Sequence, residues 1–271
     1  MYSSTNVSSL KQQIIDLGPW HLDVQVTPEI STSVFKEAPP EKYLGFGEQV
    51  NFLEGTRGKF VSLMQRIYPQ GLTGKRFLDS ACNCGGYSFW AKELGARECF
   101  GFDARQHWID QANFLLKHRS EPKQGIQFQV CDLYNLPELK LDKFQISLFK
   151  GIFYHLPDPV SGLKIAADLT EELLYLDTAT FNDYPEGCLV VSNEKTELLM
   201  SGVHGLNWLP SGPKVLEQIL KWMGFVEFRR LYWKKDINGK FSNRGRLGLL
   251  ASRKPGLFEN FDRSQGSISN F

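Results

Sequence analysis

The stretch that decides the fold is FLDSACNCGGYSFW, residues 77–90. A short apolar run ends in an acid, Asp79, and small residues then lead into a second apolar and aromatic run. Cys82 and Cys84 could be half of a metal site, or the small residues could let a ligand approach the backbone. Structural zinc sites usually pair cysteines about two to four residues apart with a second pair or with paired histidines, and this chain offers neither. We therefore expect no metal, and two cysteines that serve as small packing residues.

Outward from this stretch, apolar runs alternate with amphipathic runs. The pattern predicts strands at 76–81, 99–103, 126–131, 144–150 and 173–178, with helices at 87–94, 106–118 and 159–169. Strands separated by helices imply right-handed crossovers and a parallel sheet with helices on both faces. Ligands of such sheets bind at the carboxyl ends of the strands, near the point where the strand order reverses. The quoted stretch lies at such an end.

The C-terminal part carries a different pattern. Two strands are expected at 225–233 and 243–252, joined across Asn238-Gly239, which is a strong hairpin signal. They would give the sheet an antiparallel edge.

Composition sets the broad class. The 271 residues are 42% hydrophobic and 23% charged, which is typical of a globular protein with one enlarged domain. No apolar run approaches the roughly 18 residues needed to cross a bilayer, and the first residues lack a signal-peptide pattern, so we expect a cytoplasmic protein without a membrane partner. The net charge of +1 gives no long-range attraction to a polyanion. Tight nucleic-acid binding would need a local basic patch.

The sequence of the small-residue loop distinguishes between the known nucleotide-binding motifs. No lysine follows the glycines, as a phosphate-binding loop would require, and the Gly-x-Gly-x-x-Gly pattern of dinucleotide loops is absent. The segment from Asp79 to Gly85 reads acid-x-small-x-small-x-Gly and resembles the first motif of class I S-adenosylmethionine-dependent methyltransferases. Ala81 and Asn83 stand where that family usually has glycine. The resemblance implies a Rossmann-like α/β fold with a seven-stranded sheet, mostly parallel with an antiparallel edge and with helices on both faces.

Further positions agree with the family's cofactor site. The resemblance implies that Asp103 holds the ribose hydroxyls, that Asp132 and Leu133 face the adenine, and that the segment from Lys150 lies beneath the sulfonium. The full set implied to hold S-adenosyl-L-methionine is Asp79, Ala81, Cys82, Asn83, Gly85, Asp103, Ala104, Asp132, Leu133, Lys150 and Gly151.

Four segments narrow the resemblance to one branch. FLDSACNCGGYSFWAKELGA, LFKGIFYHLPDPVSGL, NWLPSGPKVLEQILKWMGF and LGLLASRKP look like the bacterial tRNA wobble-uridine carboxymethyltransferases and their uncharacterised relatives, over roughly residues 10 to 255. Members that transfer a carboxymethyl group hold its carboxylate with a lysine, a tyrosine and an arginine. Tyr154 and Arg246 match two of these, but Leu17 stands where the lysine would be. Because leucine cannot offset a buried carboxylate, the resemblance favours the unmodified cofactor.

The remaining segments are expected to serve the substrate. We expect an N-terminal arm and helix at 1–70 as a candidate lid with hinges at Gly45 and Gly47, a methyltransferase core at 71–255 with a substrate-side insertion at 181–210, and a polar, poorly ordered tail at 256–271. Candidate substrate contacts are Trp20, His21, Asn207 and Trp208.

The sequence says least about which residue removes a proton from the substrate. Methyl transfer is an in-line displacement, so a base is needed only if the accepting atom starts protonated. His155, beside Tyr154, is the first candidate for this base, although a histidine hydrogen-bonded under the cofactor loop explains the residue equally well. His204 and Glu194 compete as groups on the substrate side.

These observations predict transfer of a methyl group from S-adenosylmethionine to an oxygen or nitrogen of a small polar molecule. Two alternatives remain: a tRNA-modifying methyl or carboxymethyl transferase, and a catalytically inactive methyltransferase-like binding protein. The near-zero net charge disfavours nucleic acid without excluding tRNA. The sequence does not indicate an oligomeric state.

Overall fold

The centre of the molecule is a seven-stranded sheet. The computed structural model describes residues 4–39, 41–43, 51–120, 122–181, 185–235 and 244–265. The strands follow the order β10-β11-β7-β6-β3-β4-β5. Their bounds are β3 Arg76–Ser80, β4 Glu98–Asp103, β5 Ile126–Val130, β6 Phe144–Lys150, β7 Thr170–Phe181, β10 Glu227–Lys235 and β11 Arg244–Ser252. β3 to β7 pair in parallel, and β11 is antiparallel to both of its neighbours. The predicted fold class is confirmed.

The strand order reverses between β3 and β6. From β3 the chain builds outward through β4 to β5, and then returns to place β6 on the other side of β3. In sheets of this kind, the loops that follow two such strands leave in opposite directions, and ligands bind outside the carboxyl ends of the strands at this point. Both loops were predicted to carry cofactor residues.

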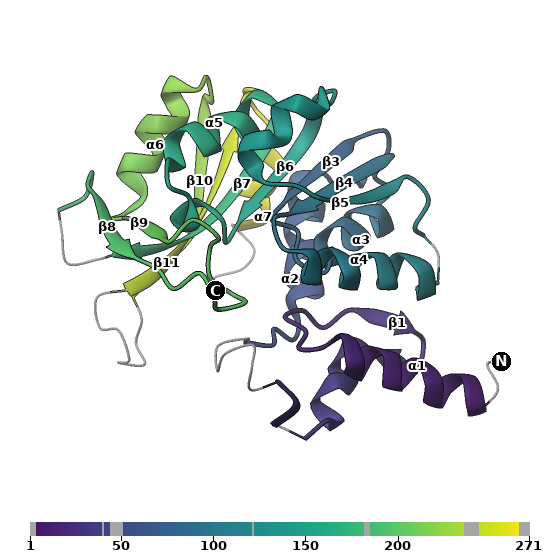
Figure 1. The fold of residues 1–271 in the computed structure, drawn as a ribbon. Coiled ribbons are helices and arrows are strands. Elements are labelled where there is room, and N and C mark those ends of the chain that lie inside the picture. The colour runs from purple at the N-terminus through teal and green to yellow at the C-terminus, as the bar shows by residue number, and fades with distance from the viewer. Residues whose placement is uncertain are drawn as a thin grey trace.

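Helices cover both faces of the sheet (Figure 1). One face packs against α2 (Thr56–Ile67), α3 (Gly86–Glu93) and α4 (Gln106–His118), and the other against α5 (Pro159–Asp168) and α6 (Pro213–Trp222). α4 buries Trp108, Ile109, Ala112 and Leu115, the apolar stripe that its helical spacing predicts. Each face thus has a hydrophobic core of its own.

The N-terminal arm packs against α4. It contains α1 (Ser4–Leu17), the short strands β1 (Gln25–Thr27) and β2 (Ile30–Ser31), and the 3-10 helix η1 (Thr32–Glu37); Figure 1 shows α1 and β1 beside α4. Gln111 donates to the carbonyls of Leu17 at 2.7 Å and Pro19 at 2.9 Å. Trp20 is 0% exposed, and its Nε1 donates to the carbonyl of Ile14 at 2.8 Å. Trp20 is therefore a core residue, and its prediction as a substrate contact is wrong.

The last described element is a helix that the sequence did not predict. α7 (Glu259–Gln265) lies within the stretch expected to be a poorly ordered tail. Phe258 and Phe261 are 0% and 1% exposed, and the Arg66 guanidinium lies 4.3 Å from the Phe261 ring centroid. Phe258, just before the helix, and Phe261, within it, bury their rings in the first core cluster and hold α7 against α2, although the segment as a whole is polar.

The insertion after β7 forms a separate hairpin. β8 (Leu189–Asn193) pairs antiparallel with β9 (Leu206–Pro210), and both strands lie inside the insertion expected at 181–210. Residues 194–205, here named the cap loop, connect them. The expected turn at Asn238-Gly239 and the hinges at Gly45 and Gly47 fall outside the described residues. No helix in the described part of the chain is both long and apolar enough to cross a membrane.

Candidate functional site

The loop between β3 and α3 is wound in an unusual backbone conformation. Ala81 and Asn83 have φ angles of 53° and 52°, in the left-handed region that favours glycine. These are the two positions at which the sequence departs from the methyltransferase motif. Asn83 is stabilised locally, because its Oδ1 accepts from the Cys84 backbone N–H at 2.7 Å. The loop therefore keeps a glycine-like path without glycine.

Gly85 and Gly101 face one aromatic ring. A Cβ atom on Gly85 would lie 2.5 Å from Cε1 of Phe128, and one on Gly101 would lie 2.7 Å from its Cδ1. Gly85 also has a φ of 76°. We expected Gly85 to leave room for a ligand. Both glycines make room for Phe128, and the contact of Gly85 with a ligand stays a prediction.

Asp79 holds the loop to the helix that follows it. Its side chain is 1% exposed, and its Oδ2 accepts from the Ser88 backbone N–H at 3.1 Å and the Ser88 hydroxyl at 2.8 Å. Burial raises its pKa to about 7 despite these hydrogen bonds. Asp79 is thus a buried acceptor at the N-terminal turn of α3.

Asp103, at the end of β4, joins two loops. Its Oδ2 accepts from the Asn83 backbone N–H and its Oδ1 from the Arg105 backbone N–H, both at 3.0 Å. Burial raises its pKa to about 6. The carboxylate is therefore fixed at the carboxyl edge of the sheet, next to the motif loop, while the neighbouring Ala104 is exposed.

Cys82 and Cys84 are buried thiols. They are 2% and 0% exposed, and burial raises the pKa of Cys84 to about 12. A thiol with a raised pKa is a poor metal ligand and a poor nucleophile. Among the residues that the structure describes, no group of three His, Cys, Asp or Glu side chains could hold a metal ion.

Asp132 contacts the cap loop. Its Oδ1 accepts from the Tyr134 backbone N–H at 2.9 Å and thereby caps the start of the 3-10 helix η3 (Leu133–Leu139). Its Oδ2 lies 3.1 Å from His204 Nε2. The Tyr134 ring packs edge-on against the His204 ring. Leu133 is 3% exposed within the second core cluster, so its contact with adenine stays a prediction.

Arg105 was missed by the sequence analysis, although it fastens the cap loop. Its Nη2 donates to the carbonyls of Thr196, Leu198 and Ser201 at 3.0, 3.1 and 2.9 Å. The only sequence signal was its place two residues after Asp103. The cap loop therefore contacts the segments that follow β4, β5 and β6.

His155 meets Glu194 at the start of the cap loop. His155 ends the 3-10 helix η4 (Phe153–His155) after β6, and its Nδ1 lies 2.7 Å from Glu194 Oε1. The Tyr154 and His155 rings lie 3.9 Å apart between centroids. The structure therefore pairs two residues that the sequence had offered as separate catalytic candidates.

A buried acid with two cations lies beside Tyr154. Asp177, in β7, is 0% exposed and accepts from Lys150 Nζ at 2.7 Å, from Arg246 Nε at 2.6 Å and from the Tyr232 hydroxyl. Burial alone would raise its pKa, but the two cations outweigh burial and the pKa is lowered. Arg246 Nη1 also lies 3.3 Å from the Tyr154 hydroxyl. Asp177 was missed, and its one signal was an acid within an apolar strand.

Gly151 allows the chain to turn directly beside Asp177 and its two cations. Its φ is 76°, and its N–H donates to the Asp177 carbonyl at 2.9 Å. A Cβ atom here would lie 3.6 Å from Arg246 Nη2. The glycine is thus required by the backbone path rather than by a clash with the guanidinium.

His21 is neutral and close to the same cations. Burial lowers its pKa to about 4, and the charges of Lys150 and Arg246 act in the same direction. Its Nδ1 lies 2.6 Å from the Asn51 carbonyl. His21 remains a candidate substrate contact.

Asn207 and Trp208, the other two predicted substrate contacts, both lie in β9 of the β8–β9 hairpin. The register places Asn207 opposite Ser192 and Trp208 opposite Val191, so the two side chains lie on opposite faces of the hairpin. Their contacts with a substrate stay predictions.

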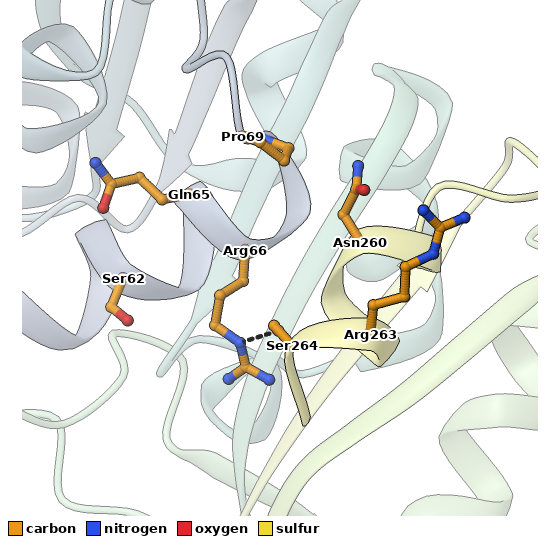
Figure 2. Close-up of a pocket in the computed structure, with 7 residues that line it drawn as sticks. All are labelled: Ser62, Gln65, Arg66, Pro69, Asn260, Arg263 and Ser264. Atoms are coloured by element: carbon orange, nitrogen blue, oxygen red, sulfur yellow. Dashed lines mark hydrogen bonds between the residues drawn. The ribbon is translucent and has the colours of Figure 1, made fainter. Parts of the chain in front are cut away.

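A surface groove lies apart from these residues. It runs between α2 and α7 and is lined by Ser62, Gln65, Arg66, Pro69, Asn260, Arg263 and Ser264 (Figure 2). Arg66 Nε donates to Ser264 Oγ across it at 2.7 Å. It contains none of the predicted cofactor, substrate or catalytic residues.

Known proteins resemble this chain in both sequence and structure. No family model matches. The chain is 34% identical over 123 residues to the tRNA U34 carboxymethyltransferase of Campylobacter hominis, a match covering 44% of this chain and 41% of the relative. It is 30% identical over 171 residues to that of Ectopseudomonas mendocina, covering 61% and 49%. The chain spans about half the length of these curated relatives, and the aligned stretch is shorter than the motifs suggested.

Solved structures agree with the fold. The N-terminal domain of EvdMO1 with SAH bound has a TM-score of 0.69 at 17% identity, covering 92% of this chain and 97% of that one. A putative S-adenosylmethionine dependent methyltransferase from Listeria monocytogenes has a TM-score of 0.51 at 12% identity, covering 73% and 99%. The chain therefore has the fold of class I S-adenosylmethionine-dependent methyltransferases, and it resembles the branch that contains the tRNA U34 carboxymethyltransferases.

Proposed function

We propose that this chain is an S-adenosylmethionine-dependent methyltransferase that modifies tRNA. The observation that carries the proposal is the position of Asp103. Its carboxylate is fixed by two backbone N–H groups at the carboxyl edge of the sheet, beside the loop that follows β3. A ligand bound at the carboxyl ends of β3 and β4 would lie next to this carboxylate.

The residues at this edge fit the cofactor. A carboxylate has about four lone-pair directions, and Asp103 uses two of them, so two remain for the ribose hydroxyls. Asp132, near the adenine position, has one oxygen on Tyr134 and the other on His204. When bound, S-adenosylmethionine would supply an electrophilic methyl carbon on a sulfonium.

The choice of tRNA over a small polar molecule reverses the expectation from the sequence. That expectation depended on the net charge of +1. Net charge does not report how charges are distributed over a surface, and a local basic patch is enough for phosphate contacts. Both relatives described above are named as tRNA enzymes, which supports tRNA as the first candidate and leaves the small molecule second.

A specific observation favours carboxymethyl transfer as a second candidate reaction. Lys150 and Arg246 share the single carboxylate of Asp177, so one positive charge has no anion among the described residues. This charge could attract a carboxylated cofactor. Against it, Leu17 is partly buried against the first core cluster and supplies no cation. We therefore place plain methyl transfer first.

The test begins with purified protein, S-adenosylmethionine and bulk bacterial tRNA. We expect calorimetry to show cofactor binding, and mass spectrometry of digested tRNA to show a nucleoside heavier by one methyl group. Absence of cofactor binding would support the inactive binding protein. Binding without any change in the tRNA would return the small molecule to first place.

A competition between S-adenosylmethionine and its carboxylated form separates the two reactions. We expect the wild type to retain the plain cofactor, as read by native mass spectrometry. Preference for the carboxylated form, lost in Lys150→Met, would establish the second candidate, because that substitution removes a cation next to Asp177.

A further inference from the structure

The charge of the chain is unevenly distributed along the sequence. Residues 213–252, which run from the start of α6 to the end of β11, contain 9 of the 31 Lys and Arg residues but only 3 of the 30 Asp and Glu residues. This stretch therefore has a net charge of +6, and the rest of the chain has a net charge of −5. The near-zero charge of the whole molecule thus hides a basic part that attracts polyanions.

Acids neutralise some of the cations in this stretch. Arg229 forms an ion pair with Asp262 at 2.5 Å, and Arg246 shares the carboxylate of Asp177 with Lys150. The exposed cations of the stretch that form no ion pair within the described part of the chain are Lys214, Lys221 and Arg230.

The helix α6 presents two of these cations on one stripe. It turns its apolar side to the sheet, where Pro213, Val215, Leu216 and Leu220 are buried. Lys214, Gln218 and Lys221 are exposed at spacings of four and three residues, so they lie on the opposite side of the helix. Glu217, on the same helix, forms no ion pair with either lysine. Trp222, at the end of α6, is 70% exposed.

The edge strand β10 continues the stripe. Lys221 Nζ lies 5.7 Å from the ring centroid of Phe228, and the Arg230 guanidinium lies 5.7 Å from that of Trp233. Both rings pack against the second core cluster, as α6 does, and Figure 1 shows α6 on this side of the sheet. The cations of the helix and of the strand therefore share one surface. We name this surface the basic edge and define it by Lys214, Lys221, Trp222 and Arg230.

One end of the basic edge lies level with the candidate site. β10 runs parallel to β7, because β11 is antiparallel to both. The register places Tyr232 of β10 level with Asp177 of β7 and Lys150 of β6, three strand spacings or about 14 Å away. The start of α6 lies at this end, since a Cβ atom on Gly212 would lie 3.0 Å from Trp233 Cζ2.

Protection of the sheet edge does not explain this surface. Charged residues on an edge strand prevent pairing with other strands, and this accounts for Arg230. It does not account for Lys214 and Lys221, which lie on a helix, or for the exposed indole of Trp222. A basic stripe with an exposed aromatic ring has instead the composition of a surface that contacts phosphates and stacks an unpaired base.

We propose that the basic edge binds the phosphate backbone of an RNA, with an unpaired base stacked on Trp222. This deepens the proposed function and depends on it, because the same RNA supplies the nucleoside that is modified. Contacts of Lys and Arg with phosphates do not read the base sequence, and an indole ring stacks on any base. The basic edge therefore supplies affinity, and the candidate site selects the nucleoside.

The first test measures binding of bulk bacterial tRNA by fluorescence anisotropy over a range of salt concentrations. One variant combines Lys214→Gln, Lys221→Gln and Arg230→Gln. The matched control removes the same charge at exposed positions elsewhere on the chain and combines Arg97→Gln, Lys117→Gln and Lys143→Gln. We expect the basic-edge variant to bind at least tenfold more weakly and to lower the slope of log affinity against log salt by about two, because fewer counterions are released. The control should match the wild type.

The second test separates stacking from charge. Trp222→Ala should weaken tRNA binding about tenfold and leave the salt slope unchanged, because it removes a ring and no charge. Trp222→Phe keeps a ring and should recover part of the affinity. Urea unfolding of each variant checks that these exposed substitutions leave the fold intact.

The outcomes distinguish this proposal from the proposed function. Equal tRNA affinity in the basic-edge variant and its control would overturn the basic edge, while modification of tRNA by the wild type would keep the methyltransferase in place. If the wild type binds tRNA through these residues but does not modify it, the proposed function fails and the basic edge stands. Binding to phosphatidylglycerol vesicles without binding to tRNA would overturn the RNA as the partner.

Discussion

At the residue scale, the acids that end the strands already have hydrogen-bonding roles within the chain. Asp79 accepts from Ser88, and Asp103 accepts from two loops. A carboxylate has about four lone-pair sites, so the same acid can accept hydrogen bonds from the chain and also bind the cofactor. What the structure adds is the burial of these acids, which gives each an unusual titration.

We expect Asp103→Ala to weaken S-adenosylmethionine binding by about 2 kcal/mol, roughly thirtyfold, because hydrogen bonds to a charged group are lost. The free energy of unfolding should also fall, since the N–H groups of Asn83 and Arg105 lose their acceptor. Calorimetry and urea unfolding measure the two effects. Asp110→Ala, on the exposed side of α4, is the control, and equal cofactor affinity in the two variants would contradict the prediction.

The titration of Asp79 makes stability depend on pH. Its pKa rises from the usual 3.8 to about 7 on folding, so the folded chain keeps a proton that the unfolded chain releases between about pH 4 and about pH 7. The free energy of unfolding should therefore fall as the pH rises through this window. Asp79→Asn keeps an acceptor for Ser88 and does not titrate. The difference between wild type and variant should shift with pH, and parallel pH profiles would refute the assignment.

At the element scale, the periodic segments were predictable and the segments held by distant contacts were not. The strand at 144–150 and the helix at 106–118 match the structure at both ends, because their apolar spacing is regular. β9 and α7 were missed, because each is short and depends on a few buried side chains.

The residues of the candidate site also fall into those that the sequence predicted and those that it did not. Asp103, Asp132 and His155 could be named as candidates because each lies at the end of a recognisable strand or within five residues after it. Arg105 and Asp177 were not found, because the function of each depends on a partner far along the chain: Ser201 is 96 residues from Arg105, and Arg246 is 69 residues from Asp177. Sequence periodicity carries no information on such pairings.

The cap loop gives a prediction at this scale. Arg105→Ala removes the donor shared by three carbonyls, so amides of residues 195–203 should exchange with solvent about tenfold faster, as expected for loss of a hydrogen bond to a charged group. Hydrogen-exchange mass spectrometry measures this. Arg97→Ala, which removes an exposed partner of Glu98, is the control. Unchanged exchange in the loop would show that Arg105 does not fasten it.

At the scale of the whole molecule, the candidate site lies where the strand order reverses, and the core clusters on the two faces of the sheet extend well beyond it, although Cys82 belongs to the first and Leu133 to the second. The first core cluster extends from the N-terminal arm to α7. Stability and activity can therefore be altered separately, by substitutions in different places.

Phe261→Ala tests this separation. Removal of a fully buried ring should lower the free energy of unfolding by about 3 kcal/mol, measured by urea unfolding. The affinity for S-adenosylmethionine should not change, because α7 packs against α2 and contains no site residue. Arg263→Ala, at an exposed position of the same helix, should leave both quantities unchanged. A loss of cofactor affinity in the folded Phe261 variant would contradict the separation.

The ring of Phe128 has a consequence for how this chain can evolve. It fills the space that side chains at positions 85 and 101 would need, so the three positions constrain one another. A methyl group added at 101 while Phe128 is present would overlap with its ring, whereas a smaller residue introduced first at 128 would leave a cavity. Homologues that differ at these positions should therefore differ at 101 and 128 together.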